Sequence, residues 1–269
     1  MMDRLTTYLR EHTEGGVALA YSGGVDSTLL LHALLRLREE QTFPLVAYYF
    51  RTPLQTEEET QDALQTARHA GIEPVQMEHD PLQLPRLRFN PKDRCYHCKL
   101  HMFSHMAQNA ASGGLHVLMD GTNADDHRQY RPGLQALREL GVLSPLAAVG
   151  FTKAQVRELA AAWGIPCASK PSAPCLATRF DYGVELSPEA IRRVEAGESL
   201  LRRHFPGEPL RLRVHGNLAR LELPPALMPA ALQLAPTLTR DLQALGYRHI
   251  TLDLLGFRSG SYDEPTPSS

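Results

Sequence analysis

The chain has 269 residues, 43% of them hydrophobic, and a formal net charge of -2 at pH 7. This size is enough for one large domain or two modest ones. The charge argues against a nucleic-acid-binding surface, which usually carries a basic excess, and no apolar run is long enough to span a membrane. Since the first residues also lack the apolar core of an export signal, we expect a cytoplasmic protein.

Apolar and β-branched runs predict buried strands at 17–21, 45–50, 74–78 and 116–120. Between and after them, periodic patterns with start and stop signals predict helices at 4–12, 28–35, 56–71, 95–111 and 152–163. Strands that alternate with helices predict an α/β fold, in which a parallel sheet carries helices on both faces. Ligands of such sheets bind at the carboxyl ends of the strands.

A different pattern begins after residue 180 and predicts a smaller α+β domain. Ser187-Pro188 is a helix start, and the alternation over 210–223 around Gly216-Asn217 is typical of a hairpin. A helix over about 225–245 and a strand at 250–254 complete this domain. We therefore expect a first domain over 1–182, a C-terminal domain over 183–262 and a disordered tail over 263–269.

The turn between the first predicted strand and helix is Ser22-Gly23-Gly24-Val25-Asp26-Ser27. Such a turn presents backbone N–H groups at the positive end of a helix dipole, and two glycines let a phosphate approach the backbone. The hydroxyls of Ser22 and Ser27 add donors. The turn lacks Gly-Lys-Ser/Thr, so it is not the usual mononucleotide P-loop. It resembles the pyrophosphate loop (PP-loop) of enzymes that cleave ATP to AMP and pyrophosphate, and an ordinary capped Gly-Gly turn is the alternative.

Four cysteines lie at positions 95, 98, 167 and 175. Without an export signal, metal or catalytic roles are favoured over a disulfide framework. Cys95 and Cys98 form a Cys-x-x-Cys pair, and a helix would place both thiols on one face. Such a pair is compatible with half of a zinc site, a redox pair or an iron–sulfur half-site.

Cys175 lies in a proline-stiffened segment between Lys170 and Arg179. Nearby positive charge favours a thiolate, so we interpret Cys175 as a reactive or metal-bound sulfur, with a small apolar plug as the alternative. Cys167 is expected to fill the interior.

Charged residues near the other predicted turns suggest further contacts. Arg211 and Arg213 share one face of a strand, and guanidinium groups can bind phosphate in a fork geometry. The alternative is a solvated polar face of a hairpin, in which Glu222 on the partner strand pairs with an arginine. The candidates for magnesium or ribose contacts are Asp26, Asp125 and Asp126. The alternative roles of these residues are helix capping and turn formation. The candidates for countering phosphate charge are Lys99 and Lys153.

Several of these stretches together resemble the LarE family of ATP-dependent sulfur transferases, which build the nickel-pincer nucleotide cofactor. They are 22–27, 121–126, 144–146, 151–153, the Cys175 segment and 252–261. The resemblance implies a PP-loop fold of the adenine nucleotide alpha-hydrolase-like kind, with ATP and Mg²⁺. ATP would adenylate a carboxylate of pyridinium-3,5-biscarboxylic acid mononucleotide, AMP would leave, and sulfur would arrive as a thiocarboxylate.

The resemblance also implies roles for individual residues. Cys175 and Asp26 are the expected catalytic residues, and the ATP-binding residues are Ser22, Gly23, Gly24, Val25, Asp26 and Ser27. Arg211, Arg213 and Glu222, with Glu198 nearby, are expected at the substrate phosphate. Some members consume the sulfur of the cysteine at the position of Cys175. Others hold a [4Fe-4S] cluster on three cysteines, and the extra pair makes this chain resemble that type, with Cys95, Cys98 and Cys175 as ligands. Whether Cys167 joins them stays open.

The expected partners are a small nucleotide, sulfide or another sulfur donor, and further copies of the chain, without nucleic acid or membrane. Three other interpretations remain: a PP-loop enzyme that thiolates tRNA, a synthetase related to NAD synthetase, and a zinc-binding interaction module. The first would show a basic RNA-binding surface, the second has no use for three thiols, and the third is opposed by the phosphate loop.

Overall fold

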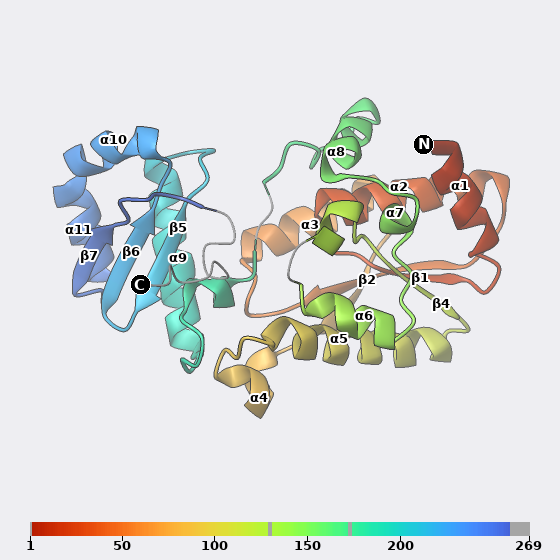
Figure 1. Cartoon of the computed structure of the whole chain (residues 1–269), viewed down its shortest axis with the longest axis horizontal. Coiled ribbons are helices and arrows are strands. Elements are labelled where there is room, and N and C mark those ends of the chain that lie inside the picture. Colours follow the sequence, from red (N-terminus) through yellow and green to blue (C-terminus); the bar gives the residue numbers. More distant parts are fainter. Residues whose placement is uncertain (1, 129–130, 172–173, 259–269) are drawn as a thin grey trace. The chain divides into compact units, whose positions relative to one another are not determined.

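The computed structural model describes residues 2–128, 131–171 and 174–258, in two compact units. One unit comprises Met1–Pro81 and Lys92–Ser172, and the other comprises Leu82–Pro91 and Ala173–Ser269 (Figure 1). The domain ranges expected from the sequence stay a prediction, since compactness alone does not show that a unit folds independently. The tail over 263–269 lies outside the described residues.

The sheet of the first unit confirms the predicted parallel arrangement. Its strands are β1 (Val17–Ala20), β2 (Leu45–Arg51), β3 (Val75–Glu78) and β4 (Val117–Asp120), in the spatial order β3-β2-β1-β4. β1 pairs in parallel with both β2 and β4, and β2 pairs in parallel with β3. Because β1 and β4 are neighbours, the turns that follow them lie side by side at the carboxyl edge of the sheet.

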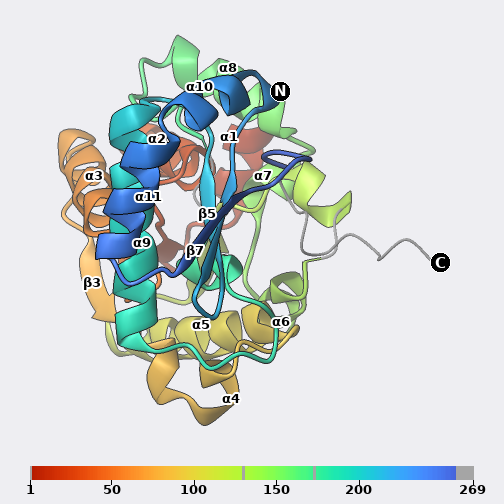
Figure 2. The same cartoon turned by 90° about the vertical axis from the view of Figure 1, so that its left-hand side faces the viewer.

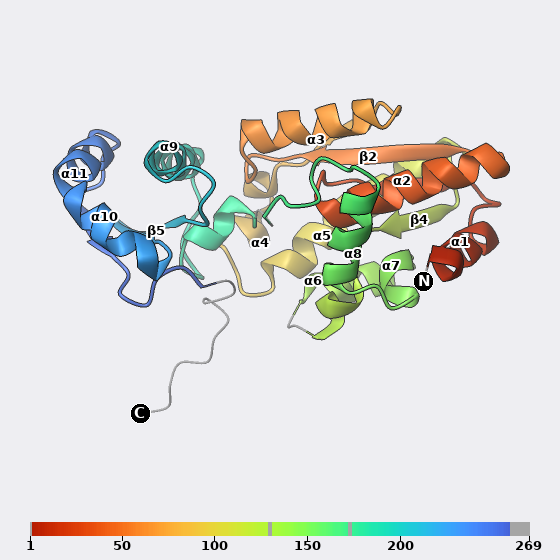
Figure 3. The ribbon, with the colours of Figure 1, turned by 90° about the horizontal axis from the view of Figure 1, so that it is seen from above.

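Helices cover both faces of this sheet, as expected for the α/β fold. α1 (Met2–Glu11), α2 (Val25–Glu40), α3 (Glu57–His69), α7 (Pro145–Ala148) and α8 (Lys153–Ala162) share one core. α5 (Arg94–Ser112) and α6 (Gly133–Glu139) share the other. In Figure 1, α2 and α8 lie above the strands and α5 and α6 below them, and Figure 3 views the unit from the upper side.

The pleat of β1 explains why two cores form. Val17 and Leu19 pack into the core of α2, while Ala18 between them packs into the core of α5. Successive side chains of a strand point to opposite faces, so a short apolar run serves both layers.

In the second unit, β5 (Arg211–His215) and β6 (Leu218–Glu222) form the predicted antiparallel hairpin. β7 (His249–Leu252) pairs in parallel with β6. α9 (Pro188–His204) starts at Ser187, whose hydroxyl accepts a hydrogen bond from the Ala190 N–H at 3.1 Å. α9 and α11 (Ala235–Ala244) pack on this sheet (Figure 2). α4 (Pro85–Arg88) belongs to the same unit, because the Asn90 amide donates to carbonyls of the 177–181 segment.

The single helix predicted over 225–245 is wrong. A 3-10 turn at Pro225–Leu227 leads into α10 (Met228–Gln233), and α11 begins separately at Ala235. Pro229 and Pro236 each lie in the first turn of a helix. A proline has no N–H to donate to the preceding turn, so it starts a helix more readily than it continues one.

Candidate active site

The Ser22–Ser27 turn joins β1 to α2, as predicted, and its two glycines have different roles. Gly23 has φ +74°, and a Cβ there would lie 2.3 Å from the Cβ of Ala63 in α3. Gly24 is the N-cap of α2, so no capping side chain can occupy the first N–H groups of this helix. A turn of this kind leaves those donors for an anion.

The two serines of the turn have different surroundings. Ser27 is 4% exposed, and its Oγ donates to the Gly24 carbonyl at 3.1 Å while accepting from the Ser22 N–H at 3.2 Å. Ser22 is exposed, with its Oγ 3.1 Å from that of Ser27. Ser27 therefore fixes the shape of the loop, and Ser22 presents a hydroxyl at its surface.

The turn after β4 lies directly against the first turn. A Cβ on Gly121 would come within 2.6 Å of the Ser27 backbone nitrogen, so the backbones of the two turns are in direct contact. The Asn123 amide donates a hydrogen bond of 3.0 Å to the Asp26 carboxylate. Asn123 and Asp26 are far apart in the sequence, and the parallel pairing of β1 with β4 brings them together.

A third segment joins them at the start of α8. The Lys153 Nζ pairs with the other oxygen of Asp26, and the Lys153 N–H donates to Asp125 Oδ2 at 2.8 Å. Asp126 accepts from the Asn123 N–H at 3.0 Å and from Arg131 at 2.8 Å. The structure thus brings the predicted Asp26, Asp125, Asp126 and Lys153 into one network of hydrogen bonds and ion pairs.

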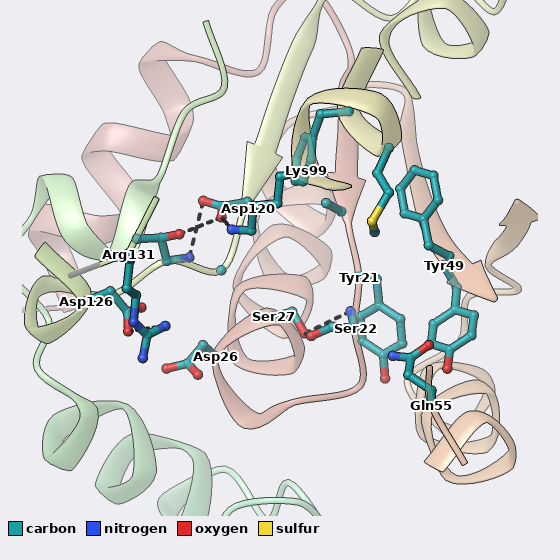
Figure 4. Close-up of a pocket in the computed structure, with 16 residues that line it drawn as sticks. Tyr21, Ser22, Asp26, Ser27, Tyr49, Gln55, Lys99, Asp120, Asp126 and Arg131 are labelled. Carbon is teal, nitrogen blue, oxygen red and sulfur yellow. Dashed lines mark hydrogen bonds and ion pairs between the residues drawn. The ribbon is translucent and has the colours of Figure 1, made fainter. Parts of the chain in front are cut away.

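These loops open into a pocket of about 290 Å³ (Figure 4). Its polar wall includes Ser22, Asp26 and Asp120, and its apolar wall includes Phe50, Met102 and Phe103. In Figure 4, Asp26, Asp126 and Arg131 lie on one side, with Tyr49 and Gln55 on the other. A pocket with a polar end and an aromatic end suits a nucleotide, which has a charged phosphate chain and a flat apolar base.

Asp120 was not singled out from the sequence, although it ends a buried strand. It is 6% exposed and accepts hydrogen bonds from Ser144 Oγ at 2.6 Å and from Thr122 Oγ1 at 2.5 Å. The Lys99 Nζ, which the sequence did suggest, lies 3.9 Å from the Asp120 carboxylate and lines the pocket. The signal for Asp120 was its place at the carboxyl end of a parallel strand.

Cys95 and Cys98 lie in the first turns of α5, where Cys95 is exposed and Cys98 half-buried. The Cys98 Sγ lies 3.6 Å from the Sδ of Met102, a lining residue of the pocket, and 3.2 Å from the Nε2 of His79. Burial, and then repulsion from the nearby His101, lowers the pKa of His79 to about 4. The His79 imidazole is therefore neutral at pH 7. Nothing in the sequence around His79 indicated this pairing.

Cys175 belongs to the second unit and precedes the 3-10 helix Leu176–Arg179. Its carbonyl accepts from the Thr178 hydroxyl at 2.8 Å. Arg179, 5% exposed, makes two hydrogen bonds of 2.8 and 2.9 Å to Glu198 and donates to the Pro174 carbonyl at 2.8 Å. These bonds fix the backbone on both sides of the Cys175 thiol.

Cys167 is 5% exposed and packs in the core of α2 and α8 in the first unit. Within residues 2–128, 131–171 and 174–258, no group of three or more His, Cys, Asp or Glu side chains is arranged to hold a metal ion. The three-cysteine ligand set therefore stays a prediction.

Arg211 and Arg213 are 5% and 1% exposed, so this hairpin face is not solvated, although the pairing with Glu222 that the alternative expected is present. Arg213 Nε donates to Glu222 at 2.6 Å, and Arg211 Nη1 lies 3.7 Å from the same carboxylate. Burial, and then repulsion from Arg213, lowers the pKa of Arg211 to about 10, which still leaves it cationic at pH 7. In the part of the chain that the structure describes, Arg211 Nε is buried without a hydrogen-bond partner. A buried donor of this kind is suited to an anionic ligand.

No helix within the described ranges is long and apolar enough to cross a membrane.

A family described as PP-loop domain matches residues 1–127. Pyridinium-3,5-bisthiocarboxylic acid mononucleotide synthase of Lactiplantibacillus plantarum is 36% identical over 250 residues, which cover 92% of this chain and 89% of that protein. An uncharacterized protein of Synechocystis is 37% identical, covering 90% of each chain. An uncharacterized protein of Methanocaldococcus jannaschii is 28% identical, covering 90% of this chain and 91% of its own.

The PP-loop, its pocket and a similarity that extends through both units all agree with the family suggested by the sequence motifs. The chain is a member of the LarE family of PP-loop proteins.

Proposed function

We propose that this chain is an ATP-dependent sulfurtransferase of nickel-pincer cofactor synthesis, which converts a carboxylate of pyridinium-3,5-biscarboxylic acid mononucleotide to a thiocarboxylate. The observation that carries the proposal is the PP-loop pocket, in a chain that is 36% identical over 92% of its length to a synthase of the corresponding bisthiocarboxylic acid.

The first half of the reaction is activation of the carboxylate. A substrate carboxylate oxygen attacks the α-phosphorus of ATP, the bond to the bridging oxygen of the β-phosphate breaks, and pyrophosphate leaves with that electron pair. In this proposal the first N–H groups of α2 and the Ser22 hydroxyl hold the departing phosphates, which the exposure of Ser22 and the glycine at the start of the helix support. Lys153 supplies a cation at the same turn, oriented by Asp26. Mg²⁺ would enter with ATP and neutralise phosphate charge, and Asp26, Asp125 and Asp126 are the candidate ligands.

The second half replaces the activated oxygen by sulfur. A sulfur nucleophile attacks the carbonyl carbon of the adenylate, and AMP leaves with the bond to the former carboxylate oxygen. Both the ATP cleavage and the sulfur attack need a substrate held by groups other than the reacting carboxylate. We assign that anchoring to Arg211 and Arg213 at the substrate phosphate, with Glu222 orienting both guanidinium groups.

We further propose that Cys95, Cys98 and Cys175 together bind a [4Fe-4S] cluster. Thiolates are the usual ligands of such clusters, and the half-buried Cys98 already has a hydrogen-bonding imidazole beside its sulfur. When bound, a cluster with three protein ligands supplies an iron that can carry an exchangeable sulfide. The core position of Cys167 gives no support to a fourth ligand. A cytoplasmic location and a homo-oligomeric state stay predictions.

The activation step is tested by incubating the protein with ATP and the biscarboxylate nucleotide under anaerobic conditions. Pyrophosphate should appear only when both substrates are present, and AMP should appear in equal amount once sulfide is added to take the place of the activated oxygen. Release of ADP and orthophosphate would exclude the proposed cleavage between the α- and β-phosphates. Tight, salt-sensitive binding of tRNA would instead favour a tRNA-thiolating enzyme.

A further inference from the structure

His79 and Cys98 form a pair that the chemistry above does not use. His79 directly follows β3 and is 3% exposed, and its backbone N–H donates to the Arg51 carbonyl at 2.8 Å. Its Nε2 lies 3.2 Å from the Cys98 Sγ. The Phe50 ring, which lines the nucleotide pocket, meets the His79 ring edge-on with centroids 6.5 Å apart. The imidazole is thus held in one orientation by its backbone and by a pocket wall.

The direction of the hydrogen bond follows from the other neighbour of the sulfur. The Cys98 Sγ lies 3.6 Å from the Met102 Sδ, and a thioether can accept a hydrogen bond but has none to give. A thiol has one proton, so when it points to Met102 the bond to His79 must use an N–H of the imidazole. When the thiol is deprotonated, its sulfur can only accept. In both of these states the donor is Nε2–H, whereas a thiol that donates to Nε2 instead gives up its contact with Met102.

We propose that His79 is a positioning residue for the Cys98 sulfur, to which its Nε2–H donates a hydrogen bond that holds the thiol beside Met102 and persists when the thiolate binds iron. The last part rests on the proposed function, in which Cys98 is a cluster ligand. Hydrogen bonds to a ligating sulfur are one of the means by which a protein sets the potential and stability of an iron–sulfur cluster.

The hydrogen bond itself is tested on metal-free protein labelled with ¹⁵N at histidine. Long-range ¹H–¹⁵N spectra of the imidazoles identify the tautomer of His79, with His79→Gln to assign its signals. We expect the proton on Nε2, and a shift of this nitrogen in Cys98→Ala but not in Cys95→Ala. A proton on Nδ1, or an Nε2 signal that ignores Cys98→Ala, would overturn the inference.

The effect on the cluster is tested by the midpoint potential of the reconstituted protein. His79→Phe keeps a ring but loses the hydrogen-bond donor, so the midpoint potential should fall. The reason is that the hydrogen bond stabilises the reduced cluster, which carries more negative charge than the oxidised one. His79→Gln keeps an N–H and should recover part of the shift.

The matched control for the potential is His101→Gln. It removes an imidazole that packs on the His79 ring, with centroids 5.1 Å apart, and leaves both atoms of the hydrogen bond in place. Equal potentials in His79→Phe and wild type would contradict the role of His79. If wild-type protein assembles no cluster, the iron assignment fails, and the imidazole spectra still decide whether His79 donates to Cys98.

Discussion

The side-chain amide of Asn123 donates a hydrogen bond of 3.0 Å to the carboxylate of Asp26. The other carboxylate oxygen pairs with the Nζ of Lys153. Asn123 and Lys153 lie 97 and 127 residues beyond Asp26 in the sequence. One side chain of the PP-loop therefore connects the turn after β4 with the start of α8. The PP-loop and the turn after β4 line the polar end of the nucleotide pocket, and Lys153 is joined to it through Asp26.

Replacing Asp26 by Asn should lower the rate of pyrophosphate release by roughly a hundredfold, because the Lys153 cation loses its counter-charge and its orientation at the phosphates. The measurement is coupled detection of pyrophosphate at saturating ATP. The matched control is Asp62→Asn, which breaks an exposed pair with Lys170 in the same unit and should leave the rate unchanged. Equal rates for the two variants would show that the contacts of Asp26 with Asn123 and Lys153 serve the fold and not the reaction.

Gly23→Ala should destabilise the protein more than Gly71→Ala does. Both glycines have positive φ, +74° and +89°, but a Cβ on Gly23 meets the Ala63 Cβ at 2.3 Å whereas Gly71 faces open space. The backbone conformation costs about 1–2 kcal/mol in each variant, and the overlap adds roughly 1–3 kcal/mol for Gly23 alone. Urea unfolding measures both. Equal losses would mean that α3 yields to the added methyl group without cost.

Arg211→Lys should raise the concentration of biscarboxylate nucleotide needed for half-maximal pyrophosphate release by about tenfold or more, since charge-assisted hydrogen bonds contribute about 1.5–3 kcal/mol. A lysine keeps the charge but loses the fork and the buried Nε. ATP binding, measured by calorimetry, should change little. Arg192→Lys, at an exposed pair with Glu189, is the control. An unchanged nucleotide requirement would place the substrate phosphate elsewhere.

Cys95→Ala distinguishes the two sources of sulfur, because it removes a proposed cluster ligand and leaves Cys175 in place. We expect it to lose both the visible absorption of the cluster and repeated turnover with sulfide. Cys167→Ala should keep both and cost about 1 kcal/mol as a small core cavity. Mass spectrometry after turnover should find Cys175 intact. A loss of about 34 Da at Cys175, hydrogen sulfide leaving dehydroalanine, would show that the thiol itself is consumed.

Tyr21 should make stability depend on pH in the alkaline range. Its hydroxyl donates to the Ala63 carbonyl at 3.0 Å, and burial raises its pKa from 10.0 to about 12. The unfolded chain therefore loses this proton first, so the contribution is complete below pH 10 and is lost as the pH rises toward 12. Urea midpoints should fall more steeply above pH 10 in wild type than in Tyr21→Phe. Parallel curves for the two proteins would contradict this assignment.

Local patterns were enough to predict the strands, the helix starts and the PP-loop, because those features depend on residues close in the sequence. Thr56 and Thr152, for example, begin helices with capping boxes formed three residues on. The contacts that the sequence could not give depend on distant segments. Asp120 acquires its role from Ser144 and Lys99, and His79 from Cys98.

The burial of Arg211 and Arg213 was also beyond local reasoning. Two alternating arginines in a hairpin are compatible with a solvated face, and only the packing of the second unit shows which face is covered. Conversely, the pattern over 225–245 predicts one continuous helix, whereas Pro229 and Pro236 each start a separate one.

We expect ATP cleavage at the PP-loop to drive the transfer of one sulfur atom to a carboxylate. The most direct measurement is the mass spectrum of the nucleotide product after anaerobic incubation with ATP and ³⁴S-labelled sulfide. The product should have one oxygen replaced by ³⁴S, should form repeatedly per chain and should be absent without ATP. A product that carries only unlabelled sulfur, limited to one per chain, would contradict a renewable sulfide. A nucleotide that is adenylated but never gains sulfur would contradict sulfur transfer altogether.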